Sequence, residues 1–162
     1  MIRELNINIQ PLNQSDLPSV ALLHAAAFPD SALTKLGLEA VRRYYEWQLN
    51  GPHDVDALGA FHGDRLVGFC FSGIFRGAMS GFLQRNWLFL TGCALIRPWL
   101  ILNPVFRDRV TLSMSILKRL LRQFIKRRKT PYQSSSPKPP KSYGILSIAV
   151  DPNYQGLGIG GY

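Results

Sequence analysis

The 162-residue chain has the length of one ordinary domain, and its apolar content of 46% can build a core if the whole chain takes part. Its two cysteines, Cys70 and Cys93, show no CxxC or His-rich spacing, which argues against a disulfide scaffold or a cysteine-based metal site. The net charge of +9 is local: residues 76–129 carry twelve Lys and Arg against one acid, and the rest of the chain has a net charge of −2.

No segment near the start predicts export or membrane insertion. The first twelve residues lack the apolar core of a signal peptide, so we expect a cytoplasmic protein. The longest apolar block, Trp87–Ile96, is ten residues long, whereas a helix needs about 20 to cross a bilayer core. His24, His53 and His62 show no ligand spacing, and no metal site is predicted.

The first elements are predicted to be a strand and a helix. Residues 5–12 alternate apolar and polar side chains, as in a half-buried strand. The next segment predicts a helix that Ser15 or Asp16 caps, with Pro18 in the first turn, where a missing N–H costs nothing.

A second helix and a hairpin are predicted next. Apolar residues repeat near the helical period from about Thr34 to Leu49, and Gly51 with Pro52 closes this helix. Residues 55–74 then predict two strands joined by a turn at Gly63 and Asp64.

Residues 75–129 predict a basic helical insert. The large apolar side chains between Trp87 and Leu102 are too many for a solvated loop, and an apolar stripe at helical spacing runs from Val110 to Phe124. The favoured interpretation is a helical subdomain. One alternative is an element that meets anionic lipid headgroups at a membrane surface through residues 76–129. A nucleic acid or an acidic partner is less favoured, because no recognised motif is present.

Residues 130–141 predict a Pro/Ser-rich linker, and an apolar strand follows at residues 142–150. The strand leads into DPNYQGLGIGG, a glycine-rich loop whose backbone N–H groups could approach a phosphate or pyrophosphate. A Walker P-loop is excluded, because neither lysine nor Ser/Thr follows the glycines. The dinucleotide pattern GxGxxG is formally present, but five residues separate it from the strand and no acid follows about 20 positions later. The pattern Gln/Arg-x-x-Gly-x-Gly/Ala fits best, at Gln155, Gly158 and Gly160.

Together, the strand LSIAV, the DP bend, Tyr154 and QGLGIG resemble the acetyl-CoA-binding segment of the GNAT family of N-acetyltransferases. The resemblance implies an α/β (α+β) fold with a mixed, mainly antiparallel sheet flanked by helices. It also implies transfer of an acetyl group from acetyl-CoA to an amine of a small molecule, glycan or peptide. The strand would bind the pantetheine arm through Ile148, Ala149 and Val150. The loop would bind the pyrophosphate through Gln155, Gly156, Leu157, Gly158, Ile159 and Gly160.

In this family the acceptor pocket lies beside the connection between the first two helices, which here contains Phe28, Asp30 and Ser31. The alternative is that Asp30 or Ser31 only caps the helix that follows. Direct attack requires a deprotonated amine, and many family members place a carboxylate on or near the central strand. No acid lies on residues 142–150, and Ser147 is the only polar side chain inside that strand, so the catalytic residues stay unassigned.

The resemblance covers about residues 3–74 and 141–162, and the second half of the family pattern does not appear in the sequence. We therefore expect residues 1–162 to be a single incomplete GNAT-like domain, the front portion of a longer acetyltransferase. As it stands, this chain is expected to bind acetyl-CoA poorly and to transfer no acetyl group. The alternative is a non-catalytic GNAT-like binding protein whose basic insert associates with a membrane surface or an acidic partner.

Overall fold

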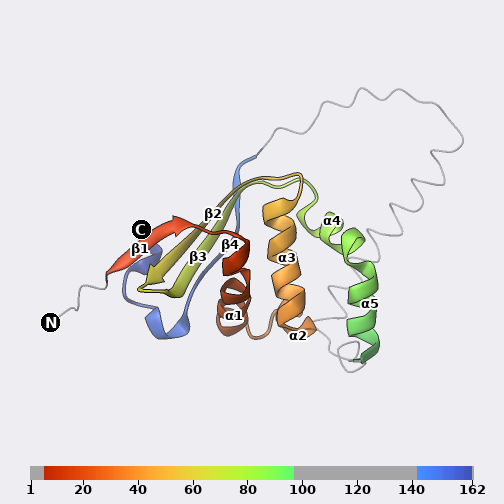
Figure 1. The fold of residues 1–162 in the computed structure, drawn as a ribbon, viewed down its shortest axis with the longest axis horizontal. Coiled ribbons are helices and arrows are strands. Elements are labelled where there is room, and N and C mark those ends of the chain that lie inside the picture. Colours follow the sequence, from red (N-terminus) through yellow and green to blue (C-terminus); the bar gives the residue numbers. More distant parts are fainter. Residues whose placement is uncertain (1–5, 97–141, 162) are drawn as a thin grey trace, which may run out of the picture. The chain divides into compact units, whose positions relative to one another are not determined.

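The computed structural model describes residues 6–96 and 142–161. Of the described chain, residues 6–93 and 142–161 belong to one compact unit. Its elements, in chain order (Figure 1), are β1 (Ile7–Pro11), the 3-10 turn η1 (Gln14–Asp16), α1 (Leu17–Ala27), α2 (Ala32–Leu36), α3 (Leu38–Asn50), β2 (Asp54–His62), β3 (Arg65–Ile74), α4 (Ala78–Arg85), α5 (Trp87–Ile96), β4 (Gly144–Val150), and the 3-10 turns η2 (Pro152–Tyr154) and η3 (Ile159–Gly161).

The strands form one antiparallel sheet in the order β1-β2-β3-β4. The prediction of a mixed α and β fold with a mainly antiparallel sheet is confirmed at this level, as are the predicted hairpin and the strand before the glycine loop. β3 lies between β2 and β4 and brings together segments that are far apart in the sequence, because Gly73 is in register with both Val55 and Gly144. Among the described residues, β4 has no strand on its second edge.

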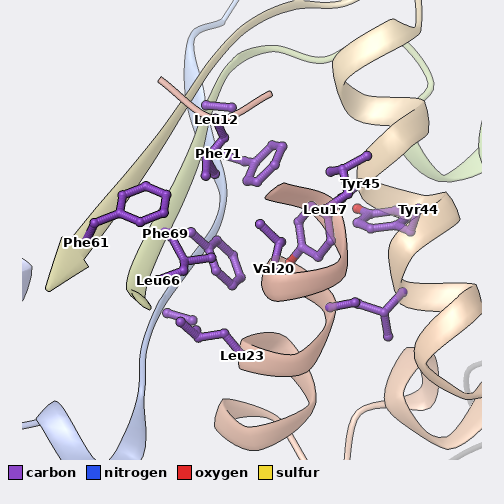
Figure 2. Packing of buried hydrophobic residues seen from close by; sticks show 14 of the residues in the cluster. Leu12, Leu17, Val20, Leu23, Tyr44, Tyr45, Phe61, Leu66, Phe69 and Phe71 are labelled. Atoms are coloured by element: carbon purple, nitrogen blue, oxygen red, sulfur yellow. The ribbon is translucent and has the colours of Figure 1, made fainter. Parts of the chain in front are cut away.

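The main core lies between α1, α3 and one face of the sheet (Figure 2). Alternation along β3 points Phe69 and Phe71 at the helices, where both rings contact Tyr45 with centroids 5.3 Å and 4.6 Å away. Such aromatic pairs stabilise a core by about 0.5–1.5 kcal/mol each beyond their burial. This core fixes β4 against α1 and α3, because Ala149 is buried in the same cluster.

A second, smaller cluster forms on the other face of the sheet. Its buried members are Ala60, Val67 and Ile159, and Tyr154 packs against them. A Cβ built on Gly68 would lie 3.6 Å from Cγ2 of Ile159, so the loop after β4 folds back onto the sheet at this glycine.

The structure corrects two local predictions in the helices. The first turn is capped by Asn13, whose side chain accepts from the Ser15 N–H at 2.8 Å, while Asp16 Oδ2 accepts from the Asn13 N–H at 2.9 Å. Neither Ser15 nor Asp16 makes a side-chain capping bond to α1. The predicted second helix is two helices, α2 and α3, because Gly37 between them has φ 106°, a conformation that L side chains rarely adopt.

The start of the predicted insert is helical. α4 packs on α3 and buries Phe82, and α5 follows after Asn86. The predicted amphipathic helix between Val110 and Phe124 and the predicted linker at residues 130–141 lie outside the described residues. Within residues 6–96 and 142–161, no helix combines the length and apolar character needed to span a membrane.

Candidate functional site at the β4 edge and the glycine loop

β4 offers one edge of free backbone beside the loop. Cys70, Phe69 and Gly68 of β3 pair with Ile148, Ala149 and Val150. In the described chain the opposite edge of these residues meets no strand, so outward N–H and C=O groups can pair with an extended ligand.

Three side-chain interactions hold the loop that follows β4. Oδ2 of Asp151 accepts from Arg65 at 2.8 Å, and its Oδ1 accepts from the Asn153 N–H at 2.9 Å. The Tyr154 hydroxyl lies 3.2 Å from Nδ1 of His62. Together with the buried Ile159 side chain, these contacts anchor both ends of the loop to the sheet.

The glycines of the loop are exposed, and two of them have unused N–H groups. Gly156 and Gly158 have φ values of 77° and 80°, which only glycine adopts without strain. A Cβ built on Gly156, Gly158 or Gly160 meets nothing within 4 Å. The N–H groups of Gly156 and Gly158 make no hydrogen bond to another residue in the described part of the chain. The loop therefore presents bare backbone donors to open space, an arrangement suited to an anion.

The other predicted loop residues have different roles. Gln155 donates from Nε2 to the Val150 carbonyl at 3.3 Å and so closes the loop on the end of β4. The Leu157 side chain is exposed, and Ile159 is an anchor whose side chain points into the sheet. Of the nine predicted residues, three lie on β4 and six in the loop, where only the glycines have the open backbone expected of a phosphate loop.

A hydrogen-bonded chain of side chains joins β4 to the connection between α1 and α2. The Tyr45 hydroxyl donates to Ser147 Oγ at 2.9 Å and lies 2.9 Å from His24 Nδ1, while His24 Nε2 lies 3.3 Å from Ser31 Oγ. Tyr45 and His24 are buried. Neither residue was predicted from the sequence, because a tyrosine and a histidine on the core faces of two helices do not differ from ordinary core residues.

Burial sets the protonation states of these hydrogen-bonded side chains. Desolvation lowers the pKa of His24 to about 4, so the imidazole is neutral near pH 7. Desolvation also raises the pKa of the Tyr45 hydroxyl, although its bond to Ser147 opposes this shift. The hydrogen bonds among these side chains can therefore orient the Ser147 hydroxyl. A histidine with so low a pKa is a weak proton acceptor.

Two of the three predicted acceptor residues, Phe28 and Ser31, lie beside the buried His24. Ser31 caps α2, since its Oγ accepts from the Thr34 N–H at 3.0 Å, and the same oxygen faces His24. The Phe28 ring lies 5.0 Å from the His24 ring. Asp30 points elsewhere: its side chain is 95% exposed and pairs with Lys35 at 3.2 Å. The capping interpretation therefore holds for Ser31, and Asp30 is separate from the buried chain.

Other candidate groups carry no evident chemistry. The Asn153 backbone N–H and Arg65 lower the pKa of Asp151, which makes this carboxylate a poor general base. Cys70 and Cys93 are free thiols. Among the described residues no group of three His, Cys, Asp or Glu side chains could hold a metal ion.

Comparisons with known proteins add no identification: no family model, curated protein or solved structure matches the chain.

Proposed function

We propose that β4 and the glycine loop bind acetyl-CoA as part of an N-acetyltransferase site. The observation that carries this proposal is the pair of N–H groups at Gly156 and Gly158 that have no partner in the described chain, in a loop that follows a strand edge with no described neighbour. In this proposal the N–H groups bind the pyrophosphate, and the outer backbone of Ile148 to Val150 pairs with the pantetheine amides.

The proposed reaction is attack of an acceptor amine on the thioester carbonyl, which forms the amide and releases the CoA thiol. Backbone N–H groups at the β4 edge can stabilise the oxyanion of the tetrahedral intermediate. The ammonium form of the acceptor must first lose a proton. We assign Ser147 a positioning role here, because the buried Tyr45 and His24 fix the orientation of its hydroxyl.

Acetyl-CoA titration followed by backbone amide NMR tests the proposal and detects weak as well as tight binding. We expect the largest shifts at residues 148–150 and 155–160. Gly160→Ala places a methyl group in open space at a residue without positive φ, so its stability should stay unchanged while its affinity falls about tenfold.

Gly144→Ala is the matched control. Gly144 also has open space around its Cβ position, but it lies at the far end of β4 from the loop. We expect its acetyl-CoA affinity to equal that of the unmodified chain. Equal affinities for Gly160→Ala and Gly144→Ala, or shifts that avoid the loop, would contradict the proposal.

A further inference from the structure

A cavity away from the β4 edge lies between α3 and the C-terminal end of α4. It has a volume of about 260 Å³ and is lined by Arg43, Glu46, Trp47, Asn50, Arg85 and Asn86. The four residues from α3 recur at helical spacing on one face, whereas the neighbouring Tyr44 and Tyr45 enter the core. None of the lining residues belongs to β4 or to the glycine loop.

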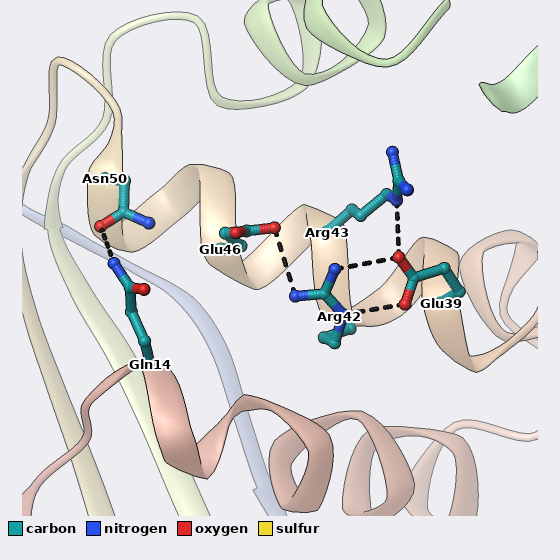
Figure 3. Close-up of polar contacts among 6 residues, drawn as sticks. All are labelled: Gln14, Glu39, Arg42, Arg43, Glu46 and Asn50. Carbon is teal, nitrogen blue, oxygen red and sulfur yellow. Dashed lines mark hydrogen bonds and ion pairs between the residues drawn. The ribbon is translucent and has the colours of Figure 1, made fainter. Parts of the chain in front are cut away.

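The cavity lining holds hydrogen-bond donors that are not in use. The Arg85 side chain makes no hydrogen bond or ion pair with another described residue. Arg43 Nε donates to Glu39 at 2.7 Å (Figure 3), and its two terminal nitrogens have no partner among the described residues. Nε1 of Trp47, a residue of the lining, is buried and likewise has no hydrogen-bond partner in the described part of the chain. Asn50 Oδ1 accepts from Gln14 at 3.0 Å, which leaves the Asn50 amide N–H₂ as a further donor (Figure 3).

The charge of the lining is positive. The lining contains two arginines, Arg43 and Arg85, and one acid, Glu46, which pairs with Arg42 at 3.3 Å. Glu39 accepts from both Arg42 and Arg43 (Figure 3), so no carboxylate compensates Arg85 in the described chain. Arginine binds phosphate and carboxylate groups through two parallel N–H···O bonds. The Arg85 guanidinium, which has no partner among the described residues, can make such a pair of bonds with a ligand.

Aromatic rings lie beside both guanidinium groups. Cζ of Arg43 lies 4.3 Å from the centre of the Phe89 ring, and Cζ of Arg85 lies 6.0 Å from that of Trp47. Cation–π attraction at these distances occupies no oxygen acceptor, so it does not replace a hydrogen-bonding ligand.

From these observations we propose that this cavity binds a compact phosphate-bearing molecule. Arg43 and Arg85 hold the phosphate oxygens, and the Asn50 amide supplies a further donor. The volume is below the roughly 300–1,000 Å³ of pockets for drug-sized ligands, so the occupant is small. The proposal does not depend on the acetyltransferase function.

Titration of the full chain with inorganic phosphate, followed by NMR of the indole and backbone N–H groups, tests this inference. We expect saturable shifts of the Trp47 indole N–H, assigned with Trp47→Phe, and of α3 and α4 amides. Arg43→Gln and Arg85→Gln should each weaken binding at least about tenfold. Arg76→Gln changes net charge equally at an arginine outside the lining and should weaken it less than about twofold.

Two outcomes would overturn the inference. Equal losses for Arg85→Gln and Arg76→Gln would show general attraction of anions to a basic protein. Binding to vesicles that contain phosphatidic acid, without saturable binding of inorganic phosphate, would assign the arginines to a lipid surface.

Discussion

Acidification from about pH 6.5 to pH 4 is expected to lower the free energy of unfolding by about 3 kcal/mol through His24 alone. Burial lowers the pKa of this histidine from 6.5 to about 4 in the folded protein. Below pH 6.5 the unfolded chain therefore binds a proton that the folded chain does not. Stability falls as the pH decreases through this window and stops falling, for this group, near pH 4.

The groups that face His24 give its charged form no compensation. Its ring contacts are Tyr45, Ser31 and Phe28, and its hydrogen-bond partners are the first two of these. None of them is a carboxylate that could stabilise the imidazolium ion. A protonated His24 would also lose the ability to accept a hydrogen bond at either nitrogen.

Urea denaturation across this pH range measures the effect, and His24→Gln removes the titrating group while keeping a polar side chain of similar size. We expect the stability of His24→Gln to vary less with pH than that of the unmodified protein. Burial lowers the pKa of His53 as well, so His53→Gln measures how much His53 contributes to the pH dependence of stability. Parallel stability curves for the unmodified protein and His24→Gln would show that His24 is not the group responsible.

Gly73→Ala is expected to reduce stability by at least about 3 kcal/mol, since it combines backbone strain with overpacking. Gly73 has φ 144°, and a Cβ there would lie 2.1 Å from the Asp54 carbonyl oxygen and 2.8 Å from Cα of Val55. Both neighbours are backbone atoms in β2, so the strands themselves must separate. Because Gly73 is also in register with Gly144, the change disturbs the entry into β4 and with it the proposed binding edge.

Gly63→Ala is the matched control for this prediction. Gly63 also has a positive φ, 61°, but a Cβ there meets nothing within 4 Å. Its cost is limited to the left-handed conformation, roughly 1–2 kcal/mol. Thermal unfolding should show a decrease in Tm of roughly 10 °C for Gly73→Ala and a much smaller decrease for Gly63→Ala. Similar decreases would mean that the close approach of β2 does not matter.

The sheet was predictable from the sequence because its signals are local. Alternation marks β1, Gly63 and Asp64 mark the hairpin turn, and an apolar run before the glycines marks β4. The break between α2 and α3 was not apparent from the sequence, because apolar residues keep the helical period on both sides of Gly37.

The site was predictable only where backbone conformation depends on residue type. The run of glycines predicted bare backbone in the loop, and Gly156 and Gly158 have positive φ values. The pairing of Tyr45 with Ser147 spans 102 positions and follows from how α3 packs on the sheet. The cavity likewise requires α4 to lie beside α3, and no periodicity in either helix shows which two polar faces will meet.

The seating of Ile159 over Gly68 has a consequence for ligand affinity. Together with Asp151 and Tyr154, it ties both ends of the glycine loop to the sheet through the protein's own side chains. The loop therefore loses its conformational entropy when the protein folds, and little is left to lose when a ligand binds. A preorganised loop of this kind can bind an anion rapidly through backbone groups alone, and its affinity should then depend on how firmly one isoleucine side chain stays in the sheet.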